Sequence, residues 1–156
     1  MQVHALDFED FDEEEYTLLG IHTALEDYKL AYLLNKELHL NLIKIKEGLT
    51  SESGNTTTSF SLFQYTNESH ECEWFLIANS ARKENSSEAN ELLLTTETKS
   101  YLIPEKKKVD YFLKITGHLA ADLIQHTLYQ VNQLDQIITA YTINKNTLKS
   151  KDFLTI

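Results

Sequence analysis

Two segments of this chain have the spacing of amphipathic helices, and the stretches around them have the pattern of strands. Residues 23–38 and 119–134 place apolar side chains three and four positions apart. The other apolar runs are short, and most of them alternate with polar residues. They predict strands at 16–22, 39–46, 59–66, 72–78, 100–103, 109–116 and 136–143. This order predicts an α+β domain with a mixed, mostly antiparallel sheet of about six or seven strands, packed by two main helices at about 24–38 and 119–134.

The length of 156 residues is typical of one domain. An acidic N-terminal segment at 1–14, in which Phe8 and Phe11 lie among carboxylates, precedes a single domain at 15–156. Polar residues dominate 47–58 and 79–98. We expect the first to be a turn or loop and the second to be a long polar loop, which is often functional in a compact domain.

The predicted helices have recognisable ends and faces. Thr23 and Glu26 have the spacing of a capping box at the start of the first helix. Its inner stripe contains Leu30, Leu33, Leu34 and Leu38, widened by Tyr28, Ala31 and Tyr32. The inner face of the second helix contains Ala120, Leu123, Ile124, Thr127, Val131 and Leu134. On the strand at 109–116, alternation predicts one face made of Val109, Tyr111, Leu113 and Ile115.

Charge and cysteine content limit the compartment and the partners. The net charge of −10 disfavours binding to duplex nucleic acid and to anionic membranes. No apolar run approaches the ~20 residues that span a bilayer, and the start MQVHALDFED lacks the features of a signal peptide. The single cysteine, Cys72, excludes a disulfide within the chain. We therefore expect a cytoplasmic protein that contacts neither duplex nucleic acid nor membrane.

No pattern of catalytic, cofactor-binding or metal-binding residues stands out. The four glycines are too scattered for a phosphate-binding loop. His70 and Cys72 would share a strand face, as in a Cys–His pair or half a zinc site, with His22 or His118 as distant further ligands. A cysteine that enters an apolar strand is more commonly a small buried side chain. His118 and His126 are eight residues apart on a helix, too far apart to share one metal ion unaided. We therefore assign no catalytic, cofactor or metal residue and expect no cofactor.

Charged residues near two predicted turns leave alternatives open. Glu105 and Asp110 flank three lysines, 106–108, which is compatible with acid–base chemistry or with an exposed turn. Lys149, Ser150 and Lys151 form a small basic spot that suits a phosphate or a solvated tail. The last residues, NKNTLKSKDFLTI, end apolar and predict at most a short edge strand.

One motif resembles that of a known family. Ile103, Pro104 and Glu105 are followed after three lysines by Val109, Asp110 and Tyr111, which matches the signature of the bacterial IPExxxVDY family. The segments GIHTALEDYKLAYLLNKELHL and TAYTINKNTLKSKDFL are also similar to that family. The resemblance implies a small intracellular bacterial protein with no assigned activity and no known catalytic residues. From the residues alone, the motif is either a structural strand–turn–strand or a site built around Glu105, Asp110 and Tyr111.

These observations favour a non-catalytic module that binds another protein or forms a homodimer. The absence of catalytic spacing, the acidic aromatic segment and the long polar loop motivate this hypothesis. A small-ligand sensor is the second hypothesis, since the strand–helix–strand at 111–143 is similar to half of a ferredoxin-type regulatory domain. An enzyme is the third hypothesis and would require a deep pocket with perturbed titratable groups.

Overall fold

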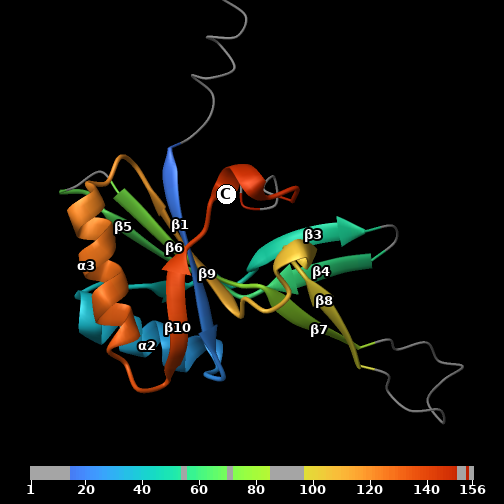
Figure 1. Ribbon diagram of the computed structural model, residues 1–156. Helices are drawn as coiled ribbons and strands as arrows, with labels where there is room; N and C mark the ends of the chain where they lie inside the picture. Colours follow the sequence, from blue (N-terminus) through green and yellow to red (C-terminus); the bar gives the residue numbers. More distant parts are fainter. Residues whose placement is uncertain (1–14, 54–55, 70–71, 85–96, 151–153, 155–156) are drawn as a thin grey trace, which may run out of the picture.

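A six-stranded antiparallel sheet forms the centre of the molecule (Figure 1). The computed structural model describes residues 15–53, 56–69, 72–84, 97–150 and 154. The strand order is β10-β1-β9-β6-β5-β2. The strands are β1 (Tyr16–Thr23), β2 (Ile43–Lys44), β5 (Leu62–Asn67), β6 (Cys72–Ala78), β9 (Tyr111–Thr116) and β10 (Ile137–Thr142). The predicted α+β class with a mostly antiparallel sheet is confirmed.

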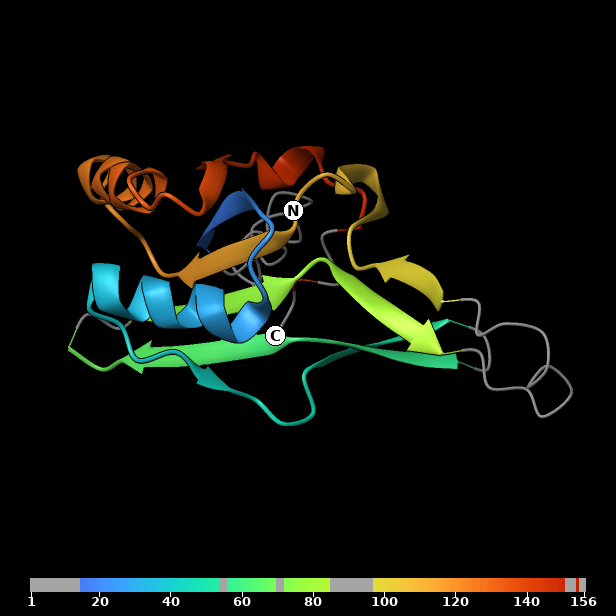
Figure 2. The ribbon, with the colours of Figure 1, turned by 90° about the horizontal axis from the view of Figure 1, so that it is seen from below.

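Two helices of similar length cover one face of this sheet, α2 (Asp27–Leu38) and α3 (Ala121–Asn132) (Figures 1 and 2). Strands β9 and β10 both pair antiparallel with β1, so they run in the same direction with β1 between them. The α3 connection is thus a split βαβ unit. The sequence suggested a mixed sheet because such units contain parallel strands, yet every pairing between described strands is antiparallel. Neither helix has the length and apolar character needed to cross a membrane.

Two hairpins project from the sheet on the side away from the helices (Figure 1). The first joins β3 (Leu49–Ser53) to β4 (Thr56–Phe60), and the second joins β7 (Ser80–Glu84) to β8 (Glu97–Tyr101). The predicted loop at 47–58 is therefore wrong, and the predicted loop at 79–98 is wrong at both of its ends. Both segments are rich in Ser, Thr and charged residues, so no apolar alternation marks them as strands. Residues 85–96 lie outside the described part of the chain.

The predicted strand at 39–46 is mostly irregular chain that follows α2. Only Ile43–Lys44 pairs in the sheet, with β5. His39 has a left-handed backbone with φ of 56°, as is typical just after a helix. The Asn35 side chain accepts a hydrogen bond from the Leu42 N–H at 2.8 Å and donates to the Leu42 carbonyl at 3.3 Å. These bonds keep the alternating residues that follow α2 out of the ladder.

The predicted capping box at Thr23 and Glu26 is also wrong. Helix α2 begins at Asp27, and Glu26 precedes it without a side-chain capping bond. Thr23 is still part of β1, where it pairs with Ile137. Its hydroxyl donates to the Gln136 carbonyl at 2.7 Å and accepts from the Leu25 N–H at 3.2 Å. The hydrogen bond from the Thr23 hydroxyl to Gln136, far away in the sequence, thus replaces the predicted capping bond at the start of α2.

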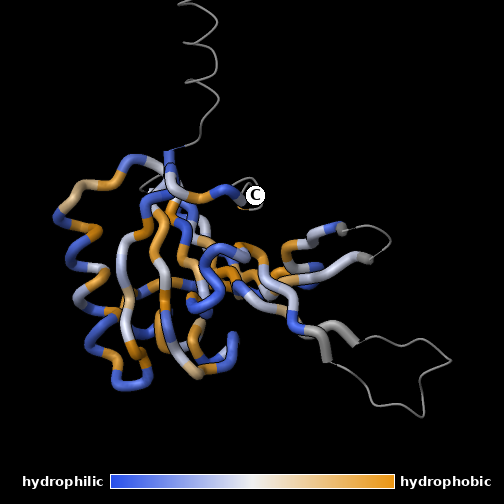
Figure 3. Tube along the Cα trace, turned by 45° about the vertical axis from the view of Figure 1, so that its right-hand side comes forward, coloured by the Kyte–Doolittle hydropathy of each residue, from blue (hydrophilic) through white to orange (hydrophobic). Residues whose placement is uncertain are grey.

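The two faces of the sheet carry separate apolar clusters, which appear as orange tube in Figure 3. The helix-side core joins α2 and α3 to one face. Its fully buried members include Ile21, Leu30, Leu34, Leu113, Ile115 and Val131. The far-side core lies on the other face, and its members include Leu18, Phe60, Ile77, Ile103, Val109, Phe112, Ile143, Leu148 and Leu154.

Irregular chain rather than helix covers the far-side core. One cover is the motif region, with a short 3-10 helix η2 (Pro104–Lys106). The other is the end of the chain, with η3 (Lys145–Thr147) followed by buried Leu148 and Leu154. The C-terminal residues thus pack as a turn where the sequence predicted an edge strand.

Several predicted side-chain directions are wrong. Val109 lies in the far-side core and not beside Tyr111, because β9 begins only at Tyr111 and the backbone turns before it. In α3, Leu123 is 46% exposed and Ala120 is exposed, so the buried stripe of that helix centres on Thr127 and Val131.

Candidate functional site

The polar residues of the IPExxxVDY-like motif hold two separate segments of backbone. Asp110 accepts a hydrogen bond from the Thr23 N–H at 2.9 Å through Oδ2. The Tyr111 hydroxyl donates to the Leu25 carbonyl at 2.7 Å. Glu105 faces the C-terminal segment instead, where its Oε2 accepts from the Lys149 N–H at 2.9 Å and from the Ser150 N–H at 3.2 Å. The structure therefore does not bring Glu105, Asp110 and Tyr111 together around one point.

The apolar motif residues have a packing role. Ile103 and Val109 are buried in the far-side core. Pro104 is exposed and opens η2, where its missing N–H is not needed by the helix.

Asn79 holds the motif in place, and sequence reasoning missed it. Its side chain is fully buried between β6 and β7. The amide nitrogen donates to the carbonyls of Lys106 and Val109 at 2.8 and 2.9 Å, and the amide oxygen accepts from the Ile103 N–H at 2.8 Å. Both ends of the motif turn are therefore tied to one side chain. The only signal in the sequence is an Asn that directly follows the apolar strand CEWFLIA.

The titration of two motif residues reflects these contacts. Burial, together with the nearby carboxylates of Asp27, Asp110 and Glu26, raises the pKa of Tyr111 to about 12. Burial opposes ionisation of Glu105, but hydrogen bonds from the Ser150 hydroxyl and from backbone N–H groups outweigh it and lower the pKa of its carboxyl. Burial and neighbouring carboxylates thus cause the shift of Tyr111, and hydrogen bonds cause that of Glu105; both accompany the backbone contacts described above.

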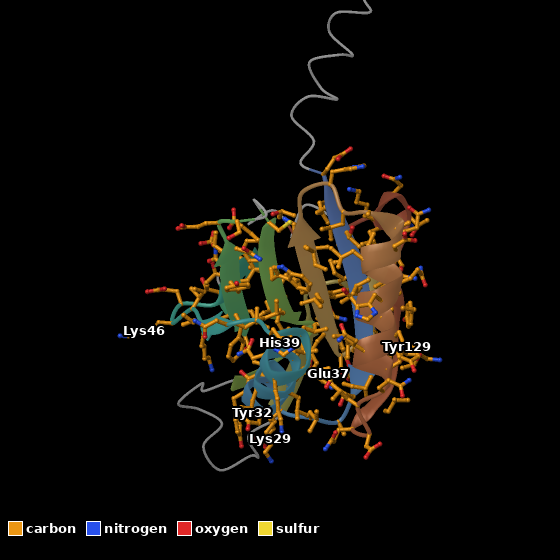
Figure 4. The ribbon with its side chains drawn as sticks, turned by 90° about the vertical axis from the view of Figure 1, so that its left-hand side faces the viewer. Lys29, Tyr32, Glu37, His39, Lys46 and Tyr129 are labelled. Atoms are coloured by element: carbon orange, nitrogen blue, oxygen red, sulfur yellow. The ribbon has the colours of Figure 1, made fainter. Side chains whose placement is uncertain are left out.

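A hollow of about 420 Å³ lies at the N-terminal end of α2. We call it the α2 hollow; its lining residues are Leu25, Tyr28, Lys29, Tyr32, Leu33 and Gln136. Figure 4 shows Lys29 and Tyr32 together on the outer side of α2, with Tyr129 well apart on α3. Tyr28 is 56% exposed and Tyr32 is 63% exposed. These two tyrosines were predicted to widen the buried stripe, and they instead face outward.

Motif residues are hydrogen-bonded to backbone groups next to or within the lining of this hollow. Tyr111 fixes the carbonyl of Leu25, which is one wall of the α2 hollow. Asp110 fixes the N–H of Thr23, whose hydroxyl in turn donates to the carbonyl of Gln136, another lining residue. Two motif side chains and one threonine therefore connect to these two lining residues.

The lining of the α2 hollow suits an apolar or aromatic group next to a negative charge. Its walls are mostly the rings of Tyr28 and Tyr32 and the leucine side chains. Lys29 is the one cation in the lining, with its ammonium 5.8 Å from the centre of the Tyr28 ring. The carboxylate of Asp27, just outside the hollow, is already bound by other groups of the chain. Burial opposes its ionisation, but hydrogen bonds from the Ser61 hydroxyl and the Tyr28 N–H, together with the charge of Lys44, lower its pKa.

The other candidates from the sequence are dispersed. Within the described part of the chain, no three His, Cys, Asp or Glu side chains gather in a way that could hold a metal ion. Cys72 is a buried free cysteine of the helix-side core, and His70 lies outside the described residues. His22 and His118 lie near opposite ends of β1: the first is 2.8 Å from the Tyr141 hydroxyl and the second 3.2 Å from the Glu15 carboxylate. His126 is exposed on α3.

The basic spot at 149–151 is bound by Glu105, whose carboxylate accepts from the backbone N–H groups of Lys149 and Ser150. Lys151 is not among the described residues. Glu105 therefore occupies the backbone donors that an anion would need there.

Comparison with models of known protein families gives no match. Comparison with curated proteins gives no match either. The resemblance to the IPExxxVDY family therefore stays a prediction that rests on the motif.

Proposed function

We propose that this chain is a non-catalytic interaction module that binds a protein partner through the α2 hollow. The observation that carries the proposal is the pair of outward-facing tyrosines, Tyr28 and Tyr32, beside an apolar depression. Tyrosine is enriched among the residues that contribute most to protein–protein binding, because its ring buries a large area at a low cost in conformational entropy. A cytoplasmic location is part of this proposal.

The partner's chemistry follows from the surroundings of the hollow. Lys29 lines it, and Lys36 is exposed one turn after Tyr32 on the same helix. We therefore propose a partner segment that inserts an apolar or aromatic side chain and places carboxylates beside these lysines. The motif residues Asp110 and Tyr111 act as positioning residues, since they hold the walls of the hollow and do not line it.

The edge of the sheet argues against a homodimer made by pairing two β10 strands. The Asn132 side chain accepts from the Ala140 N–H at 2.9 Å and donates to the Ala140 carbonyl at 3.0 Å. These are the groups that a neighbouring strand would need in the middle of β10. A second copy would have to displace Asn132, so a contact on the α2 hollow is the better supported mode.

The proposal is tested by purifying the tagged protein from its own host and measuring its mass under native conditions. The double variant Tyr28→Ser/Tyr32→Ser removes both rings of the hollow. The matched control, Tyr129→Ser/Tyr141→Ser, removes two exposed tyrosines elsewhere. We expect wild type and the control variant to carry the partner, and the hollow variant to bind it at least about tenfold more weakly. The melting temperatures of both variants should equal that of wild type. A partner that both double variants retain equally would overturn the proposal.

A small-ligand sensor is the second candidate, and the volume of the hollow favours it. About 420 Å³ lies within the range of small-molecule pockets, roughly 300–1,000 Å³. The same native mass measurement separates the two functions. A small additional mass that wild type retains and the hollow variant loses would identify a sensor, and a second protein chain would identify the interaction module.

A further inference from the structure

A group of lysines lies together around η2, in a protein whose net charge is −10. We call it the lysine face and define it by Lys99, Lys106, Lys107, Lys108 and Lys149. Lys99 and Lys107 flank one ring, with each ammonium 5.6 Å from the centre of Tyr101. Lys149 is joined to η2 by the hydrogen bond from its N–H to Glu105, and the C-terminal segment lies beside η2 in Figure 2.

Among the side chains that the structure describes, no carboxylate forms an ion pair with the lysine face. The ion pairs found there are Lys44 with Asp27 and His118 with Glu15, and neither involves these lysines. Glu105 is the one carboxylate within η2, and backbone N–H groups of the C-terminal segment already occupy it. Lys145 adds a further cation nearby: its ammonium donates to the Tyr16 carbonyl at 2.9 Å and lies 4.1 Å from the centre of the Tyr16 ring.

The complementary charge lies in the same chain and enters the fold at this point. The carboxylates concerned are Asp7, Glu9, Asp10, Asp12, Glu13 and Glu14. Glu15, the first described residue, accepts the Gly117 N–H through its carbonyl at 2.9 Å and directly precedes the tyrosine that Lys145 holds. The acidic segment 7–14 therefore meets the described fold beside Lys145.

We propose that the acidic segment 7–14 binds the lysine face of its own chain. The four residue-to-residue steps from Lys145 to Lys149 span at most about 14 Å, and the eight residues of the extended segment span at most about 28 Å, so the segment reaches η2. Phe8 and Phe11 place apolar rings among the carboxylates, and the half-buried Tyr101 ring offers a contact for one of them.

The same reach keeps the two phenylalanine rings of this segment out of the α2 hollow within one chain. The hollow begins at Leu25, beyond the far end of β1, and eight strand residues cover about 26 Å. Phe11 is four residues from Glu15, which allows about 14 Å, and Phe8 is seven residues away, which allows about 25 Å, so neither ring reaches past β1. The inference is therefore independent of the proposed function.

The test is carbodiimide cross-linking of the full-length protein, which joins carboxylates directly to lysine amines, in an equimolar mixture of isotope-labelled and unlabelled copies. We expect cross-links from residues 7–14 to Lys106, Lys107, Lys108 and Lys149, within single copies, at least about fivefold above those to the exposed control lysines Lys29, Lys36 and Lys46. In about 1 M salt, where the Debye length is about 3 Å, the yield should fall about fivefold.

Two outcomes would overturn the inference. Cross-links that join labelled to unlabelled copies would assign the contact to a second chain, and cross-links spread evenly over the control lysines would show no docking. A second readout uses amine acetylation of a variant in which the six carboxylates are replaced by the corresponding amides. We expect the lysine face to react about threefold faster in that variant than in wild type, with Lys29 and Lys36 unchanged; equal rates at the lysine face would contradict the proposal.

Discussion

The two faces of the sheet are covered in different ways. On the helix side, α2 and α3 lay apolar stripes on the strands. On the far side, the motif region and the C-terminal segment form a cover with almost no regular structure. Helices satisfy their own backbone groups internally, whereas irregular chain over a buried core needs partners from elsewhere.

The far side supplies these partners from polar side chains. Asn79 binds three backbone groups of the motif turn, Glu105 binds two N–H groups of the C-terminal segment, and buried Lys114 donates to the Leu154 carbonyl at 2.9 Å. The comparison teaches that conspicuous polar residues near a loop can be present to satisfy its backbone.

Replacing Asn79 with Ala should have the largest effect. Two buried backbone groups, the Ile103 N–H and the Val109 carbonyl, would lose their partner, whereas the Lys106 carbonyl would keep the Val109 N–H. Each loss costs about 1–3 kcal/mol, so we expect the free energy of unfolding to fall by about 3–4 kcal/mol. Urea unfolding measures it. A fall below about 1 kcal/mol would break the comparison, because the far-side cover would then not depend on this side chain.

The helix side should tolerate changes of shape better than the far side. Leu34 is fully buried in the helix-side core, and Leu34→Ala should cost about 3 kcal/mol through the cavity it leaves. Leu34→Met conserves the volume and should cost less than about 1.5 kcal/mol. On the far side, Asn79→Asp conserves the volume but replaces a double donor, so we expect a cost close to that of Asn79→Ala. Equal falls in the free energy of unfolding for Leu34→Met and Asn79→Asp would contradict this difference between the two faces.

Tyr111→Phe should lower the free energy of unfolding by about 1 kcal/mol at neutral pH, since it removes one hydrogen bond to Leu25. The folded pKa of about 12 lies above the ordinary 10.0, so the unfolded state loses this proton first as pH rises. Wild type should therefore lose stability between pH 10 and about 12 more steeply than Tyr111→Phe. Parallel pH curves for the two proteins would show that the hydroxyl is not held as the structure places it.

Glu105→Gln should have the smallest effect, a fall of one or two degrees in melting temperature at neutral pH, because the side chain is exposed. The pKa of Glu105 is lowered, so its contribution is present above its ordinary value of 4.5 and is lost as pH falls through the lowered pKa. The melting temperatures of wild type and variant should converge in acid, and a difference that persists there would indicate a role independent of charge.

The sequence predicted well the parts whose pattern is local. Strands β1, β6, β9 and β10 and both helices have clear apolar periodicity, and the structure contains them within a few residues. The hairpin of β3 and β4 has no such signal, because Ser and Thr make up most of its residues and Phe60 at its end is its one residue fully buried in the far-side core. The cap at Thr23 failed because a bond to Gln136, more than a hundred residues away, decides that hydroxyl's partner.

The candidate site was less predictable than the fold. Tyr28 and Tyr32 match the helical period closely enough to suggest burial, and only the packing of α2 on the sheet shows that they face outward. Asn79 is a single residue without a surrounding pattern, so its three bonds emerge only from the fold. The motif was recognisable as a unit, but the direction of each side chain depends on where β9 begins.

If the chain binds its partner at the α2 hollow, photo-cross-linking in the host cell should place the partner there. A benzophenone amino acid replaces Tyr32 in one protein and Tyr141, exposed on the opposite face of the sheet, in another. The account predicts one adduct of defined mass from position 32 and none above background from position 141. Adducts from position 141 alone, or equal adducts from both positions, would contradict it.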